Sequence, residues 1–294
     1  MSSLTSTLLP PAKPLLEISD LKIGFSSEAG VIPAVSGVSF SLNKGETLAI
    51  VGESGSGKSV TALSITKLLP SPPVVYQGGQ IRFEGVDLLA LSQEELRKYR
   101  WGRIAYVFQE TSRSLNPVYS IRSQMAETLK LHRPDIQNHD AEILHWLEMV
   151  GITHPQERLH SYPHQLSGGM QQRVMIAMAL CAQPDLLIAD EPTTALDVTI
   201  QAQILTKLRD LQQELNMALI LITHNFAIIR GLAHYVAVMY HGHIVEYGET
   251  EKILRKPEHP YTKALIACIP RLESNLRRLP MIESCVAKIM SHES

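Results

Sequence analysis

The sequence is poor in cysteine, in aromatic residues and in net charge. Its 294 residues include three cysteines, 5% aromatic residues and a formal net charge of −2. So few cysteines do not form a disulfide framework, and their scarcity fits a reducing compartment. The balanced charge gives no bulk basic character, which argues against a nucleic-acid-binding protein.

Long hydrophobic runs are also missing. A membrane-spanning helix needs roughly 18 to 20 consecutive apolar residues, whereas the longest apolar stretches, such as residues 218–222, have the length of a strand. Residues 1–15 contain three prolines and no charged segment before their apolar residues. They make a poor signal peptide, and we interpret them as a flexible tail. We therefore expect a chain that is neither secreted nor membrane-spanning, and that acts at a membrane only if another subunit holds it there.

Short apolar runs alternate with helical spacing along most of the chain. Residues 16–25 and 35–42 alternate apolar and polar side chains, which predicts antiparallel strands with one exposed face, and residues 236–247 indicate a hairpin around Gly242. Buried strands are predicted at 47–51, 104–108, 186–189 and 218–223, and helices at 59–69, within 121–150, and at 166–180 and 200–215. Buried strands that alternate with helices predict an α/β fold with a mostly parallel central sheet.

A glycine-rich segment joins the strand predicted at 47–51 to the following helix. It matches G-x-x-x-x-G-K-[ST], the phosphate-binding loop or P-loop, in the strand-to-helix context that distinguishes it from a chance glycine-rich turn. Glycines let successive N–H groups face phosphate oxygens, while the helix presents its positive end. We expect Lys58 to reach the β- and γ-phosphates of ATP and the Ser59 hydroxyl to bind Mg²⁺. The predicted nucleotide-binding residues of the loop are Gly52, Glu53, Ser54, Gly55, Ser56, Gly57, Lys58 and Ser59.

Two carboxylates, Asp190 and Glu191, follow the apolar run at 186–189. The strand would deliver them to the carboxyl edge of the sheet, where nucleotides bind in open α/β folds. Asp190 is expected to hold Mg²⁺ through water, and Glu191 to orient or deprotonate the water that attacks ATP. An acid after a strand is common in α/β proteins, so this assignment depends on the neighbouring P-loop.

The segment Leu166-Ser167-Gly168-Gly169-Met170, followed by Gln171-Gln172-Arg173, resembles the signature motif of ABC ATPases. A plain helix N-cap would show the same Ser-Gly-Gly pattern, and the two interpretations are compatible. In the family this helix start holds the γ-phosphate of ATP bound to the opposite subunit. The resemblance therefore implies that Ser167, Gly168 and Gly169 bind nucleotide.

Further positions resemble the family pattern, in the correct order, over residues 16–270. By this resemblance Gln109 is the Q-loop glutamine near Mg²⁺ or the attacking water, and His224 is the switch histidine on the γ-phosphate. Asp197, in the segment 195–197, is the D-loop aspartate, and Phe25 is the aromatic residue that stacks on adenine. The implied catalytic residues are Glu191, His224, Lys58 and Gln109, and the implied metal ligands are Ser59, Gln109 and Asp190.

A narrower resemblance, to the ATP-binding subunits of dipeptide, oligopeptide and nickel importers, rests on residues 108–117, 162–165 and 259–262 and on Met170. It implies a head-to-tail dimer with an identical or homologous ATPase subunit, two membrane permeases and, indirectly, a periplasmic solute-binding protein. It places the chain at the cytoplasmic face of the bacterial inner membrane. Asn225 departs from the aspartate usual in the group.

Many peptide-importer subunits carry a four-cysteine iron–sulfur motif near the C-terminus. Only Cys268 and Cys285 lie in that region of this chain, too few and without the spacing of ligands, so we predict no iron–sulfur cluster. The expected cofactors are ATP and Mg²⁺.

The family fold implied is a P-loop NTPase (RecA-like) core with an antiparallel β subdomain and an inserted helical subdomain. We expect an ABC nucleotide-binding domain at 16–256, with its helical subdomain at about 110–180, and a C-terminal tail of the oligopeptide-importer type at 257–294.

Three alternatives to a peptide-importer ATPase remain at this point. Nothing in the chain excludes a nickel importer, because the ATPase subunit does not contact the solute. A soluble ABC ATPase of translation or DNA repair usually carries two nucleotide domains or a long coiled coil, whereas this chain has one P-loop and no heptad run. A regulatory subunit without turnover is disfavoured because Glu191 and His224 are both present.

Overall fold

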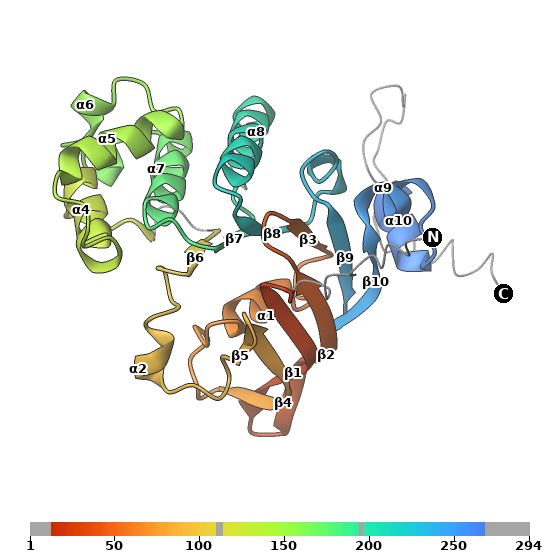
Figure 1. Ribbon diagram of the computed structural model, residues 1–294. Helices are drawn as coiled ribbons and strands as arrows, with labels where there is room; N and C mark the ends of the chain where they lie inside the picture. The colour runs from red at the N-terminus through yellow and green to blue at the C-terminus, as the bar shows by residue number, and fades with distance from the viewer. Residues whose placement is uncertain (1–12, 110–113, 194–196, 268–294) are drawn as a thin grey trace, which may run out of the picture.

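The computed structural model describes residues 13–109, 114–193 and 197–267. Figure 1 shows two β-sheets, a block of helices at one end and a pair of short helices at the other. The larger sheet has six strands in the order β10-β9-β3-β8-β7-β6. Its strands are β3 (Thr47–Val51), β6 (Ile104–Val107), β7 (Leu186–Asp190), β8 (Ala218–Thr223), β9 (Tyr235–Tyr240) and β10 (His243–Glu249).

This central sheet is mostly parallel, as predicted. Strand β3 pairs in parallel with β8 and β9, and β7 pairs in parallel with β8 and β6. Only β10 runs antiparallel, because a tight turn at Gly242 joins it to β9. The carboxyl ends of β3, β8, β7 and β6 therefore meet at one edge of the sheet.

The second sheet is antiparallel, with the order β2-β1-β4-β5. Alternating side chains predicted β1 (Leu16–Ser27) and β2 (Gly30–Leu42), although β2 begins five residues earlier than the predicted start at Val35. Strands β4 (Val74–Phe83) and β5 (Val86–Asp87) and the short helix α2 (Gln93–Leu96) were not predicted. The Gly78-Gly79 pair within β4 and its exposed centre obscure the alternation that identifies a strand.

Two of the predicted helical segments differ from the helices in the structure. The predicted helix at 59–69 ends early, because α1 stops at Ser64, and the long pattern at 121–150 contains α4 and α5 with a break between them. Besides α2, the helices in the described residues are α1 (Lys58–Ser64), α4 (Ile121–His132), α5 (His139–Met149), α6 (Pro155–Arg158), α7 (Gly168–Leu180), α8 (Val198–Glu214), α9 (Thr250–Arg255) and α10 (Pro260–Ala267), with 3-10 turns at Pro163–Gln165 and Phe226–Ile228.

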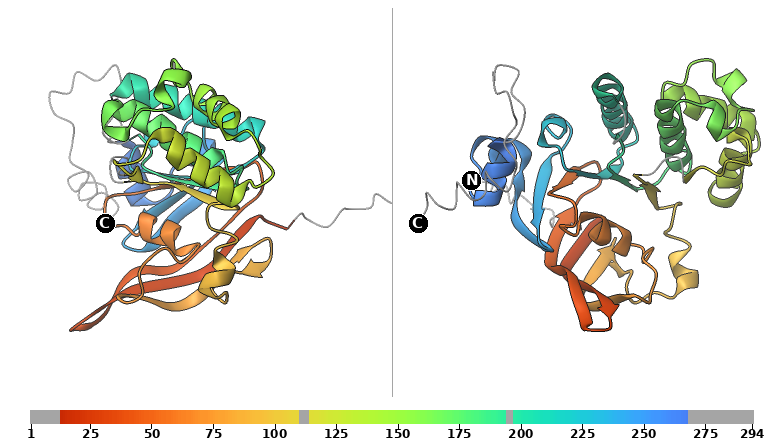
Figure 2. Two further views of the ribbon diagram at one scale, coloured as in Figure 1. Left: turned by 90° about the vertical axis from the view of Figure 1, so that its left-hand side faces the viewer. Right: turned by 180° about the vertical axis from the view of Figure 1, so that it is seen from behind.

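Alternation along the buried strands divides the core between the two faces of the central sheet. On β6, Ala105 and Val107 join the core formed with the helical block, whereas Ile104 and Tyr106 join the core formed with α1 and the antiparallel sheet. A third core, beneath α9 and α10, contains Val51 and Val238 of the central sheet. Figures 1 and 2 show the helical block (α4 to α7) and α8 on one side of the central sheet and the antiparallel sheet on the other.

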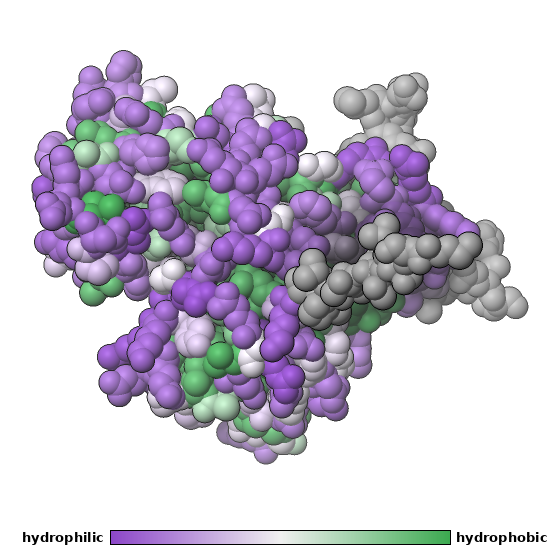
Figure 3. All heavy atoms as spheres, viewed as in Figure 1, coloured by the Kyte–Doolittle hydropathy of each residue, from purple (hydrophilic) through white to green (hydrophobic). Residues whose placement is uncertain are grey.

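None of the helices in the described part of the chain has the length and apolar character needed to cross a bilayer. Hydrophilic residues cover most of the face drawn in Figure 3, with hydrophobic residues scattered between them.

Candidate functional site

The P-loop lies between β3 and α1, at the carboxyl edge of the central sheet. Three of its glycines have positive φ angles, 154° at Gly52, 82° at Gly55 and 103° at Gly57, which side-chain-bearing residues rarely adopt. The loop closes around Lys58, whose Nζ donates to the carbonyl oxygens of Gly52 and Glu53 at 2.8 Å each. The ammonium group of Lys58 is thereby buried and directed back into the loop.

Neighbouring backbone confines the loop on one side. A Cβ atom added to Gly52 would lie 2.2 Å from the Met239 carbonyl oxygen, and one added to Gly57 would lie 2.6 Å from the Ala34 carbonyl oxygen. A Cβ on Gly55 would meet no heavy atom within 4 Å. The loop is therefore packed at both ends, while Ser54 and Gly55 at its tip are exposed.

Asp190 ends β7 beside the first turn of α1. The Ser59 hydroxyl hydrogen-bonds the Asp190 side chain, while the other carboxylate oxygen, Oδ1, is buried without a hydrogen-bond partner. A buried carboxylate oxygen without a partner is costly unless a cation or water occupies it. Hydroxyl and carboxylate oxygens are the ligands that Mg²⁺ prefers, so Ser59 and Asp190 fit a magnesium site.

Glu191 follows β7, and its side chain contacts residues that follow the two neighbouring strands. Its Oε2 accepts a 2.9 Å hydrogen bond from Gln109 Nε2, which follows β6, and its Oε1 lies 3.1 Å from His224 Nδ1, which follows β8. The Glu191 side chain is 11% exposed and the His224 side chain 59% exposed. Glu191 also has a φ angle of 45°, a left-handed conformation that is strained for a non-glycine residue and that often marks a functional position.

Burial and neighbouring charges both affect the pKa values of Lys58 and Asp190. Burial lowers the pKa of Lys58, while the nearby carboxylates of Glu191, Asp190 and Glu53 act to raise it. Burial raises the pKa of Asp190, and Glu191 acts in the same direction, whereas the Ser59 hydrogen bond and the charge of Lys58 act to lower it. Lys58 therefore interacts electrostatically with both Asp190 and Glu191.

The residues of the signature resemblance lie at the start of α7 and share none of the hydrogen bonds described for this cluster. Ser167 is the N-cap of the helix and accepts a hydrogen bond from the Met170 N–H at 3.3 Å. Ser167 and Gly168 are exposed and Gly169 is partly exposed. The first N–H groups of a helix have no intrahelical acceptor, so this start offers donors on the surface of the molecule.

Two other predicted residues also take no part in the hydrogen bonds described for the cluster. Asp197 is the exposed N-cap of α8 and accepts from the Ile200 N–H at 2.9 Å; Ala195 and Leu196 of the predicted D-loop lie outside the described residues. Phe25 lies on β1, partly buried against the core beneath the antiparallel sheet. Glu110, Cys268 and Cys285 fall outside the described residues as well.

Two contacts to the P-loop were not anticipated. The Gly242 N–H donates to the Ser56 carbonyl oxygen at 3.0 Å, and the Glu53 N–H donates to the Tyr261 hydroxyl at 3.0 Å. Both partners come from the last part of the fold, the β9–β10 turn and α10. A turn signal at Gly242 and the His259-Pro260-Tyr261-Thr262 segment are visible in the sequence, but neither indicates which loop it contacts.

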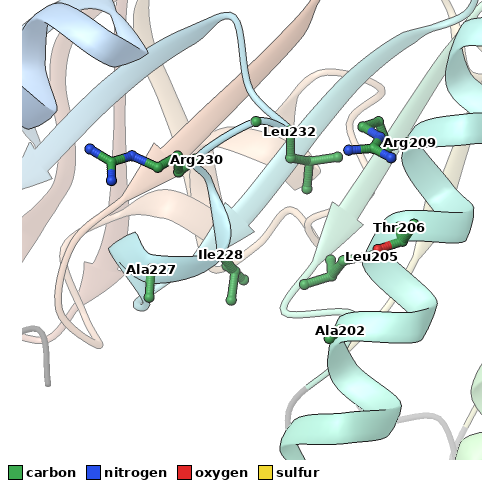
Figure 4. A pocket seen from close by; sticks show the side chains of 9 residues that line it. Ala202, Leu205, Thr206, Arg209, Ala227, Ile228, Arg230 and Leu232 are labelled. Atoms are coloured by element: carbon green, nitrogen blue, oxygen red, sulfur yellow. The ribbon is translucent and has the colours of Figure 1, made fainter. Parts of the chain in front are cut away.

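A surface pocket of about 220 Å³ lies between α8 and the segment that connects β8 to β9 (Figure 4). Among its lining residues are Leu205, Arg209 and Leu232. The residues predicted to bind nucleotide do not line it.

Comparison with known proteins identifies the family of the chain. The ABC transporter family model matches residues 35–194, and the model for the oligopeptide/dipeptide transporter C-terminal region matches residues 245–293. The oligopeptide transport ATP-binding protein OppD of Bacillus subtilis (strain 168) is 51% identical over 265 residues, which cover 89% of this chain and 73% of that protein. The dipeptide transport ATP-binding protein DppD of the same strain is 46% identical over 278 residues, which cover 94% of this chain and 83% of that protein.

A solved dimeric structure of the ATP-binding cassette MJ0796, in a post-hydrolysis state bound to ADP and Pi, has the same fold. It superposes with a TM-score of 0.71 at 26% identity and covers 80% of this chain and 98% of that chain. The match to the family model spans more than half of the 294 residues. The chain therefore belongs to the ABC transporter family, as one of its ATP-binding subunits.

Proposed function

We propose that this chain hydrolyses ATP to drive a bacterial importer of dipeptides or oligopeptides. The observation that carries the proposal is the cluster at the carboxyl edge of the central sheet, where Gln109 and His224 hold Glu191 next to the Lys58 loop. The names of the relatives OppD and DppD favour a peptide as the transported solute over nickel.

In this proposal the P-loop binds the triphosphate. Backbone N–H groups of the loop, other than that of Glu53, and of the start of α1 bind the phosphate oxygens, and Lys58 contacts the β- and γ-phosphates. Ser59 and Asp190, with Gln109 nearby, would hold Mg²⁺, which would neutralise charge on the phosphates when bound. Phe25 stacks on the adenine ring.

Glu191 is the base of the reaction. It accepts a proton from the water that attacks the γ-phosphorus, while the bond to the bridging oxygen breaks and ADP leaves with the electron pair. Gln109 and His224 fix the orientation of its carboxylate through the two contacts described above. Lys58 and His224 stabilise the charge that develops on the γ-phosphate oxygens.

The other half of each ATP site comes from a second subunit. Ser167, Gly168 and Gly169 at the start of α7 of one subunit, together with Asp197 at the start of α8, contact the nucleotide held by the P-loop of its neighbour, in a head-to-tail dimer. The exposure of Ser167 and Gly168 supports this role, because it leaves the start of α7 accessible to a second subunit. ATP then closes the pair, and product release opens it.

The dimer acts on two membrane permeases, with a periplasmic solute-binding protein as an indirect partner. These partners hold the chain at the cytoplasmic face of the inner membrane. We assign residues 16–256 to the nucleotide-binding domain, about 110–180 of them to its helical subdomain, 1–15 to an N-terminal tail and 257–294 to a C-terminal tail of the oligopeptide-importer type.

Replacing Glu191 tests the chemistry. Glu191→Gln keeps the size and hydrogen-bonding capacity of the side chain but removes its basicity. We expect ATP turnover to fall at least about 100-fold, the contribution of a positioned general base, while ATP still binds and stabilises a dimer measurable by size-exclusion chromatography. Glu148→Gln, at an exposed position on α5, is the matched control. Unchanged turnover in Glu191→Gln would remove this residue from its assigned role.

Purification from membranes tests the transport role. The full chain should co-purify with two permeases, and its ATP turnover in that complex should rise when a peptide-loaded binding protein is added. Stimulation by a nickel-loaded binding protein, with none by peptides, would contradict the solute class.

A further inference from the structure

The C-terminal helix α10 reaches the P-loop through one side chain. Tyr261 is 2% exposed, and its hydroxyl accepts the hydrogen bond from the Glu53 N–H at 3.0 Å. Burial raises the pKa of Tyr261 to about 12, so the group is a neutral phenol at physiological pH.

The bonded N–H belongs to the peptide unit that also holds Lys58. The Gly52 carbonyl, which accepts from Lys58 Nζ at 2.8 Å, and the Glu53 N–H lie on opposite sides of one planar trans peptide. When Tyr261 fixes the N–H, the carbonyl oxygen on the other side is directed at the ammonium group. Tyr261 therefore orients an acceptor of Lys58 without touching Lys58 itself.

The position of Tyr261 is itself fixed by its surroundings. Its ring packs on Tyr240 with a centroid distance of 4.2 Å, within the core that contains Val51 at the end of β3. The Glu246 carboxylate on β10 accepts the N–H groups of residues 258 and 259 at 2.9 and 3.1 Å. The N–H of Tyr261 donates to His259 Nδ1 at 3.2 Å. These contacts fix the start of α10 against β10.

We propose that Tyr261 is a positioning residue of the nucleotide site, and that α10 contributes to ATP binding through it. The proposal rests on the proposed function, because it gives Tyr261 its role through Lys58. Tyr261 fixes the first peptide of the P-loop before nucleotide arrives, and the Gly242 N–H fixes the Ser56 carbonyl at the other end. A loop fixed in this way loses less conformational entropy when it binds phosphate.

Tyr261→Phe in the full-length chain removes the hydroxyl and keeps the ring. We expect the Kd for ADP, measured by calorimetry, and the KM for ATP to rise about fivefold, the size expected for one net hydrogen bond. The kcat at saturating ATP should stay within twofold, because Glu191 and His224 are untouched. Tyr240→Phe removes a hydroxyl from the adjacent ring and should leave the Kd for ADP within twofold of the parent.

A purely structural role for α10 predicts a different pattern. Tyr261→Phe would then lower the Tm without changing the Kd for ADP, and that result would overturn the proposal. Glu246→Ala is a second test, because it removes the carboxylate that holds the start of α10. Under our proposal it disturbs the position of the Tyr261 hydroxyl. It should therefore weaken ADP binding in the parent chain but have little further effect on the Kd for ADP in the Tyr261→Phe variant. Fully additive effects on the Kd would contradict the proposal.

Failure of the proposed function would look different from failure of this inference. A parent chain that neither binds ADP nor hydrolyses ATP would overturn both. A parent that does so, and loses both when the Lys58 ammonium is removed, while Tyr261→Phe has no effect, would overturn the role of Tyr261 alone.

Discussion

The P-loop and the start of α7 are both glycine-containing turns that lead into helices, but they differ in how far the rest of the chain packs around them. The P-loop is packed between β2, the β9–β10 turn and α10, and its Lys58 is 5% exposed. At the start of α7, Ser167 and Gly168 are exposed, and the Ser167 side chain caps its own helix. Other segments of the chain pack around the P-loop, whereas the start of α7 is accessible on the surface.

This difference follows from what each turn must do under our proposal. A loop that binds phosphates gains affinity when its donors are fixed in advance, which requires surrounding structure. A turn that completes a neighbour's site has to remain accessible until the neighbour arrives. The comparison thus predicts that damage to the P-loop affects binding and turnover, whereas damage to the α7 start affects turnover alone.

The largest effect is expected at Lys58. Lys58→Met keeps most of the aliphatic stem and removes the ammonium group that donates to the loop carbonyls. Both the affinity for ADP, measured by calorimetry, and ATP turnover should be lost, turnover by at least about 100-fold, as for the removal of other electrostatic contacts in active sites. Lys207→Met, on α8, is the control. Retained affinity and cleavage in Lys58→Met would exclude the P-loop as the phosphate site.

A smaller loss of turnover, without a loss of binding, is expected at Gly168. Gly168→Asp places a negative charge where the neighbour's γ-phosphate would sit, while an acidic residue in the first turn of a helix is favourable for folding. Turnover should fall at least about tenfold, and the Kd for ADP of the single chain should stay unchanged.

Mixing the two variants separates a composite site from two independent defects. In a head-to-tail pair of Lys58→Met and Gly168→Asp chains, both defects fall in one site and the other site is intact. An equal mixture should therefore recover about a quarter of the parental turnover if chains pair at random and each intact site works alone. No recovery, in a mixture shown to form mixed dimers, would contradict the shared site.

The P-loop itself can be predicted from the sequence, whereas the tertiary contacts around it cannot. Local patterns are enough to find a strand, a glycine loop and a helix, because the whole motif lies within residues 47–64. They also place Asp190 and Glu191 at a strand end, since apolar runs reveal buried strands. The contacts that the Glu191 carboxylate makes with Gln109 and His224 follow from the adjacent positions of the parallel strands β6, β7 and β8. A mostly parallel sheet was predicted, but the order of its strands was not.

Contacts between distant segments escape this reasoning. Nothing near Tyr261 in the sequence indicates that its hydroxyl meets Glu53, because the contact joins residues 208 positions apart through the packing of α10 on the sheet. The strained conformation of Glu191, at a φ angle of 45°, also has no local signature, since the residue carries an ordinary side chain. Both features depend on tertiary packing, which overrides local preference.

Smaller effects should come from alanine substitutions that compare the packed and open glycines. Gly57→Ala places a Cβ 2.6 Å from the Ala34 carbonyl oxygen at a φ angle of 103°, whereas Gly55→Ala, at 82°, meets no atom within 4 Å. In denaturant unfolding, Gly57→Ala should lower the free energy of unfolding by at least about 3 kcal/mol. Gly55→Ala should lower it by only about 1 to 2 kcal/mol, the cost of left-handed backbone alone. Equal losses would mean that the packing around Gly57 does not constrain the loop.

The smallest effect on stability is expected at Gly169, and it should have the opposite sign. Gly169 lies in the first turn of α7, and its backbone does not have the positive φ that restricts a side chain. Alanine has the higher helix propensity, so Gly169→Ala should raise the free energy of unfolding by up to about 1 kcal/mol. The added methyl group should nevertheless lower ATP turnover, because the backbone of this turn faces the neighbour's phosphate in our proposal. A variant that is more stable and equally active would show that close approach of the Gly169 backbone to the phosphate is not required, and would leave Ser167 and Gly168 as the contacts of this turn.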